Sequence, residues 1–157
     1  MTDELIVRAD DGRTFEDAPD NGRIIISGAE TGGAYSIMEI NVAPWLKSSE
    51  AGDMRFGPHQ HAAIEEVFIV RHGTIDFLLG DAVFTLHSDD VVRVTAGTRH
   101  GYCNSSDSRA TMLVVFSPGG FEELFEKYGS DQSEALGDGF VADAGRCFAT
   151  KFEPHAP

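Results

Sequence analysis

The chain has 157 residues, of which 41% are hydrophobic and 24% are charged. This composition supports one globular domain with a buried core and excludes a disordered chain. Lys and Arg number 12 and Asp and Glu number 26, which gives a net charge of −14. The acidic balance argues against binding to nucleic acid or to anionic membrane surfaces, because both need clustered positive charge.

No membrane span or secretion signal is expected in this sequence. The longest uninterrupted apolar run covers residues 112–116, far short of the roughly 20 residues that span a bilayer. The first residues alternate charged with single apolar side chains and contain no signal-peptide core. We therefore expect a cytoplasmic protein. A disulfide between Cys103 and Cys147 is possible, but in a reducing compartment two free thiols are favoured.

Short apolar runs separated by glycines predict a protein built from strands and tight turns. The first candidate strand lies near residue 24, in GRIII, and the second covers residues 34–42, where Met38, Ile40 and Val42 alternate with polar side chains. Residues 42–58 are expected to form a connecting loop that Trp45 anchors on the body of the protein.

The central part of the sequence is the most strand-like. Residues 66–71 are expected to form a strand that is covered on both faces, and Gly80-Asp81 predicts a two-residue hairpin between strands 74–79 and 82–87. Two further strands are predicted at 91–95 and 111–117. Six or more short strands without intervening helices predict an all-β, closed or nearly closed antiparallel barrel of about 22–118.

One short helix is predicted after the last strand, over residues of about 119–128, and it is expected to pack on the barrel. Its apolar residues lie at helical spacing on one face: Phe121, Leu124, Phe125 and Tyr128. Residues 130–157 form an acidic, glycine-rich tail, for which an extra strand, a dimer arm and a loosely ordered segment all remain open. The whole chain, 1–157, is expected to be one domain.

The residues with the clearest chemical potential are the histidines of HQHAAIEE and a later histidine, His100. His59 and His61 are two apart, so on a strand both side chains leave the same face and could bind one ion. Glu66 has the opposite parity to His61, so the chain must bend between residues 62 and 65 if both bind the same ion. Glu65 has the matching parity, and the apolar residues that follow do not decide between the two carboxylates.

Residues 59–104 resemble the two signature motifs of the cupin superfamily. His59, His61, Glu66 and Gly73 fit the first motif, G-x5-H-x-H-x3–4-E-x6-G. The second motif, G-x5-P-x-G-x2-H-x3-N, is fitted by Gly97, His100 and Asn104. Asp53, Asp89 and Thr95 depart from the motifs, all at turn positions. ETGGAYSI and FSPGGFEELF extend the similarity to the small, quercetin-dioxygenase-like cupins.

The resemblance implies a single-domain cupin, a double-stranded β-helix or jelly-roll barrel, that binds one divalent transition metal ion. Its ligands would be His59, His61, Glu66 and His100. Imidazole and carboxylate together suit Fe, Mn, Ni, Cu or Zn, and four protein ligands leave about two positions of an octahedral ion for water, substrate or dioxygen. The resemblance also implies a homodimer formed through edge strands.

Most other candidate residues have a structural interpretation. His72 and His87 are expected to be solvated surface residues, and His155 is expected to be disordered. The remaining four are expected to pack in the core: Phe68, Val70, Tyr102 and Phe116. For Phe68, Val70 and Phe116, contact with the substrate is the less favoured alternative. Tyr102 has a second interpretation, in which it faces the site and helps proton transfer.

Three functions are compatible with these residues. The first is a quercetinase-like dioxygenase that acts on an aromatic enol or hydroxy-ketone, with Glu66 as the catalytic residue that takes the substrate proton. The second is a metal-dependent cyclase, isomerase or lyase without a redox step. The third is a cupin that binds a small molecule without converting it. All three imply a small-molecule partner, and the first is favoured.

Overall fold

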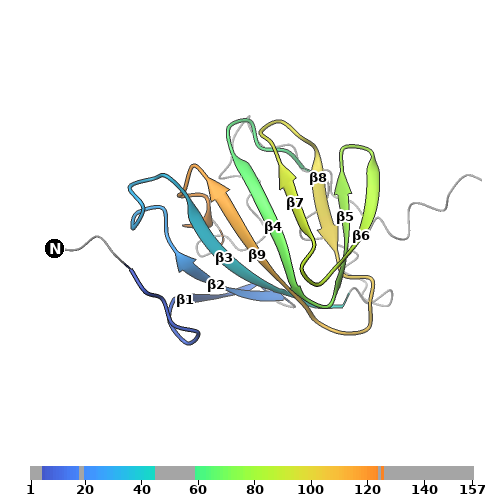
Figure 1. Cartoon of the computed structure of the whole chain (residues 1–157), viewed down its shortest axis with the longest axis horizontal. Coiled ribbons are helices and arrows are strands. Elements are labelled where there is room, and N and C mark those ends of the chain that lie inside the picture. The colour runs from blue at the N-terminus through green and yellow to red at the C-terminus, as the bar shows by residue number, and fades with distance from the viewer. Residues whose placement is uncertain (1–4, 18–19, 45–58, 124, 126–157) are drawn as a thin grey trace, which may run out of the picture.

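The fold consists of two antiparallel β-sheets that face each other (Figure 1). It was obtained as a computed structural model, which describes residues 5–17, 20–44, 59–123 and 125. The six-stranded sheet has the order β1-β2-β3-β9-β4-β7 and the three-stranded sheet the order β6-β5-β8. Nine strands lie in the described residues: β1 Arg13–Asp17, β2 Asp20–Ile26, β3 Ser36–Val42, β4 Glu65–His72, β5 Thr74–Leu79, β6 Ala82–His87, β7 Val91–Val94, β8 His100–Cys103 and β9 Ala110–Ser117.

The hydrophobic core lies between the two sheets and is built from alternate residues of each strand. In β3 every second side chain is buried, from Ser36 to Val42, and the same alternation continues on its neighbour β9. Across the core, the ring of Phe68 on β4 lies 4.9 Å from the ring of Phe77 on β5. The inward faces of both sheets therefore form one continuous apolar cluster, as the predicted all-β fold requires.

The strands predicted in the central part of the sequence are confirmed, with one difference in burial. The strand expected at residues 66–71 is β4, but only its inward face is fully buried. Val67 and Ile69 on the other face are partly exposed. The hairpin of β5 and β6 closes between Leu79 and Ala82, and Gly80 has the positive φ of 63° that a two-residue turn needs.

Two strands were not predicted from the sequence. β1, with the sequence RTFED, is mostly charged, and Phe15 is its one buried apolar residue. It forms because it pairs with β2 over its whole length. β8 has four residues, all buried, and lies at the edge of the three-stranded sheet beside β5.

The expected helix at about 119–128 remains a prediction. Only its first residues lie in the described part of the chain, and no complete helix is found there. Trp45, the expected anchor of the loop, and the tail from residue 130 lie outside the described residues. Within the described part, no helix has the length and apolar character needed to cross a membrane.

Cys103 corrects an expectation. It was predicted to be a free thiol, but in the structure it is disulfide-bonded and buried. The free thiols were predicted because a reducing compartment was expected. Disulfides are rare in such compartments, so this bond does not support that expectation.

A buried carboxylate links the chain after β9 to the turn between β2 and β3. Glu122 is 0% exposed, and its two oxygens accept hydrogen bonds from the backbone N–H groups of Gly28, at 2.6 Å, and Gly120, at 2.7 Å. Burial raises the pKa of Glu122, but the nearby Ser36 hydroxyl and these backbone N–H groups lower it by more, so the pKa lies below its ordinary value.

The backbones on the two sides of this link are in close contact. A Cβ on Gly28 would lie 2.4 Å from the backbone nitrogen of Gly120, and a Cβ on Gly119 would lie 2.5 Å from the carbonyl oxygen of Tyr35. The N–H of Gly119 also donates to the carbonyl of Gly33, at 3.0 Å. Glycines at these positions therefore allow the segment after β9 to lie directly on the β2–β3 turn.

We predict that Glu122→Gln destabilises the protein at neutral pH by about 2 kcal/mol, because one buried N–H group loses its charged acceptor. A group with a lowered folded-state pKa stabilises the fold above its unfolded pKa and loses that contribution as pH falls through its folded pKa. The difference from wild type should therefore be full at neutral pH and shrink below about pH 4.5, the ordinary value for this group. Urea unfolding at a series of pH values measures it.

Glu123→Gln is the matched control for this prediction. The Glu123 side chain is 51% exposed and pairs with Arg13 at 3.2 Å on the surface, so its loss should cost less than about 1 kcal/mol. Equal destabilisation by the two variants, or a cost of Glu122→Gln that does not depend on pH, would contradict the role given to the buried carboxylate.

Candidate metal centre

The two segments that carry the histidines are joined by backbone hydrogen bonds. The N–H of His59 donates to the carbonyl of His100, and the N–H of His100 donates to the carbonyl of His59, both at 2.8 Å. The N–H of Gly97 donates to the carbonyl of His61 at 2.7 Å. These bonds place the HQH segment beside the turn that leads into β8, although the two are about 40 residues apart in the sequence.

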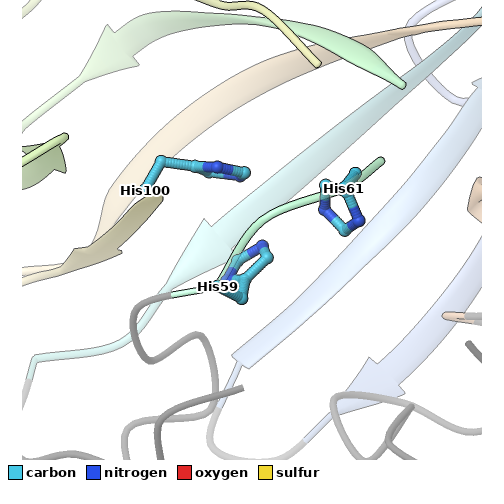
Figure 2. Close-up of side chains that lie close together, drawn as sticks. All are labelled: His59, His61 and His100. Carbon is cyan, nitrogen blue, oxygen red and sulfur yellow. The ribbon is translucent and has the colours of Figure 1, made fainter. Parts of the chain in front are cut away.

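The side chains of His59, His61 and His100 converge, as Figure 2 shows. Each offers a ring nitrogen, and these three nitrogens all lie within 4.8 Å of one another. The side chains are nearly inaccessible to solvent: His59 is 6%, His61 5% and His100 1% exposed. The sequence-based expectation that histidines from two segments gather at one point is therefore met in the structure.

Glu66 is the carboxylate that reaches this cluster. It is 3% exposed, and its Oε2 lies 2.7 Å from Nε2 of His100 and 3.6 Å from Nε2 of His61. Glu65 points to the other face of β4, where it forms two hydrogen bonds with Arg93 at 2.8 and 2.7 Å. The chain bends at residues 62 and 63, before β4 begins. A bend is thus present where the parity argument needs one, and Glu66 rather than Glu65 lies beside the histidines.

Burial keeps His61 uncharged. Loss of solvent, followed by the proximity of His100, lowers the pKa of His61 to about 4. At neutral pH the ring is therefore in the form that has a lone pair for a metal ion.

His100 is oriented by a backbone contact on its other side. Its Nδ1 lies 2.9 Å from the carbonyl oxygen of Thr98, and because a carbonyl can only accept, Nδ1 carries the hydrogen. In the neutral ring, this leaves the lone pair of Nε2 directed toward Glu66. Histidines that bind metals are commonly held in this way.

The donor set passes a test for a bound cation. Nε2 of His100 and Oε2 of Glu66 are buried 2.7 Å apart, yet neither atom makes a hydrogen bond of good geometry within the described residues. Two lone pairs at this distance repel unless they share a proton or a cation. Three imidazoles and one carboxylate could therefore hold an Fe, Mn, Ni, Cu or Zn ion, which would supply Lewis-acid or redox chemistry.

Aromatic side chains surround the histidines. Phe77 is nearly parallel to His100, at 13° and 6.5 Å between ring centroids, and Phe121 meets the ring of His61 edge-on at 4.6 Å. Four residues that were expected to pack in the core are buried, as predicted: Phe68, Val70, Tyr102 and Phe116. Sequence reasoning placed Phe121 on a helix face but missed its contact with His61, because nothing in its spacing points to a residue about 60 positions earlier.

The remaining motif residues have structural roles. Gly73 and Gly97 have φ values of 81° and 80°, as expected for turn glycines. Asn104 braces the loop after β8, since its side-chain amide donates to the carbonyls of Val42 at 3.1 Å and Ser108 at 2.7 Å.

The other histidines that the sequence offered lie apart from the cluster. His72 and His87 are exposed, as predicted. His155 lies outside the described residues.

Comparisons with known proteins agree with this fold. A family model described as a cupin domain matches residues 46–116. Among curated protein sequences, none matches the chain.

Three solved structures illustrate the similarity. KdgF from Halomonas sp. is 15% identical, with a TM-score of 0.63 over 77% of this chain and 99% of its own. A sugar phosphate isomerase from Silicibacter pomeroyi, described as a member of a cupin superfamily, is 18% identical, with a TM-score of 0.57 over 72% of this chain and 75% of its own. Pac13, a nucleoside dehydratase known from Streptomyces, is 10% identical, with a TM-score of 0.59 over 93% of this chain and 96% of its own. The family model covers residues 46–116, and these structures share the fold of the chain over a larger part of its length.

Proposed function

We propose that this protein is a metal-dependent enzyme that acts on a small molecule. The convergence of three buried imidazoles from two separate segments is the observation that carries the proposal. Burying three imidazoles and a carboxylate costs free energy, and a bound cation would offset that cost. The ligands would be His59, His61, His100 and Glu66.

Glu66 has two roles in this proposal. It is the fourth ligand, and it is the group that takes a proton from the substrate. Its Oε2 lies 3.6 Å from Nε2 of His61 and 2.7 Å from Nε2 of His100, which supports a role for Glu66 at the same site. The burial of the site excludes water, which strengthens electrostatic interactions and protects reactive species.

The first reaction class is the dioxygenase that the cupin resemblance implies. The substrate would be an aromatic enol or hydroxy-ketone, whose O–H proton passes to Glu66, and both atoms of dioxygen would enter the substrate. The aromatic rings around the histidines, Phe68, Phe77 and Phe121, support a substrate of this kind.

The second reaction class has no redox step, and a different observation favours it. Two of the structural neighbours are named as a sugar phosphate isomerase and a nucleoside dehydratase. In isomerisation or elimination, Glu66 would take a proton from a carbon next to a carbonyl or a leaving group, and no dioxygen would be consumed.

We predict that His61→Ala lowers metal affinity by more than about 100-fold, because the loss of a direct ligand costs at least as much as the loss of its supporting contacts. Metal content per chain, measured by mass spectrometry after purification and after loading with each candidate ion, tests this. His72→Ala is the control, because this histidine is exposed. A folded His61→Ala protein that keeps one ion per chain would refute the ligand assignment.

Oxygen consumption separates the two reaction classes. If the protein is a dioxygenase, the metal-loaded protein should consume dioxygen with flavonols or related enols. Glu66→Gln should then lower turnover by about 10²- to 10⁴-fold, the usual contribution of a general base. Turnover that is equal with and without dioxygen would establish the non-redox class. Tight binding of a small molecule without turnover would instead indicate a binding protein.

A homodimer is also proposed from the resemblance, and a cytoplasmic location from the sequence, although the disulfide of Cys103 argues against the location. Sedimentation equilibrium of the purified protein tests the first: a mass twice the 17.0 kDa of one chain is expected, and a single-chain mass would contradict it.

A further inference from the structure

One side of the histidine cluster is covered by a residue from outside the two motifs. Phe121 comes from the chain after β9, is 8% exposed, and meets the ring of His61 edge-on with 4.6 Å between centroids and 67° between planes. His61 is one of the three histidines that converge. Phe121 is therefore in direct contact with the candidate metal centre.

Phe121 also belongs to a group of four packed aromatic rings. Its ring lies 5.1 Å from Phe116 and 5.8 Å from Phe125, and Phe125 in turn lies 5.8 Å from Phe15. These rings come from β1, β9 and the chain after β9. These four rings form an apolar wall that begins beside His61 and extends away from the polar ligands.

The position of this wall depends on Glu122, the neighbour of Phe121 in the sequence. Its carboxylate binds the backbone N–H groups of Gly28 and Gly120. The hydroxyl of Ser117 adds a hydrogen bond to the carbonyl of Ala34, at 3.1 Å. The segment that carries Phe121 is therefore fixed to the β2–β3 turn on both sides of the aromatic ring.

We propose that Phe121 determines which molecules reach the histidine cluster, and that Glu122 is the positioning residue that holds it there. As a statement about substrate, this inference rests on the proposed function, and it adds the chemical class: a ligand with a flat, apolar group beside the atom that binds the metal. The phenyl ring of Phe121 offers no hydrogen-bond partner, so a polar group placed against it would lose its hydration without compensation.

The first test needs no metal. Diethyl pyrocarbonate acylates neutral imidazoles, and peptide mass spectrometry measures the rate at His61 in the metal-free protein. We expect Phe121→Ala to raise this rate about tenfold, because the covering ring is removed, and Phe121→Leu to raise it less. Phe125→Ala, which removes a buried ring of the same cluster, is the matched control and should change the rate less than about twofold.

The second test uses the copper-loaded protein and two probes that differ in size, imidazole and 4-phenylimidazole. Their dissociation constants are measured from the visible spectrum. In Phe121→Ala the ratio of the two constants should shift against 4-phenylimidazole by about tenfold relative to wild type, since its phenyl group loses the apolar ring that it would contact. Phe125→Ala should leave the ratio within about twofold of wild type.

Glu122→Gln tests the positioning role. It keeps Phe121 but weakens the link to the β2–β3 turn, so the acylation rate at His61 should rise to a value between those of wild type and Phe121→Ala. A merely structural carboxylate would lower stability without changing that rate at a temperature where the protein is fully folded.

The outcomes separate the inference from the proposed function. A wild-type protein that binds no metal would overturn the proposed function, while the acylation rates still decide whether Phe121 covers His61. Acylation rates that are unchanged in both Phe121→Ala and Phe121→Leu would overturn the inference, as would an equal rise in Phe125→Ala. A faster rate with an unchanged probe ratio would show that Phe121 covers the site without selecting its ligands, which also refutes the proposal. If Phe121→Ala does not fold, Phe121→Leu carries both comparisons.

Discussion

The site depends on the pair of backbone hydrogen bonds between His59 and His100. Each residue donates to the other at 2.8 Å, which is the pairing of directly opposed residues in an antiparallel ladder. This pairing holds two side chains on neighbouring segments at a fixed separation, whatever their own rotamers prefer. The convergence of the imidazoles is therefore a consequence of backbone geometry, and the side chains need only point inward.

The surroundings of the polar cluster determine which ring nitrogen of His100 carries the hydrogen and keep His61 neutral. The carbonyl of Thr98 fixes the hydrogen of His100 on Nδ1, and burial keeps His61 neutral. Glu66 adds a carboxyl group to a place with little solvent. An uncompensated carboxylate is costly in such an environment, and a bound divalent cation would offset that cost.

Much of this fold could be predicted from the sequence because most of its strands have local sequence signals, such as alternation and turn residues. Alternation identified β3, a two-residue turn identified the β5–β6 hairpin, and the parity conflict between His61 and Glu66 correctly required a bend. β1 was missed because its stability comes from pairing with β2 rather than from apolar residues of its own. The role of Phe121 was missed because contacts between distant segments leave no periodic signal in the sequence. The disulfide of Cys103 was not predicted, because the free thiol was inferred from the expected compartment and not from the surroundings of the residue.

Asp89 shows what the second motif demands at its opening position. This residue has a φ of 73°, in the left-handed region that a glycine adopts most easily, and its N–H donates to the carbonyl of Val70 at 2.7 Å. Aspartate is among the few other residues that tolerate this conformation. At this turn a residue other than glycine thus holds the left-handed conformation. A search that insists on glycine there would overlook chains of this kind, whereas one that accepts any residue able to adopt the left-handed region would retain them.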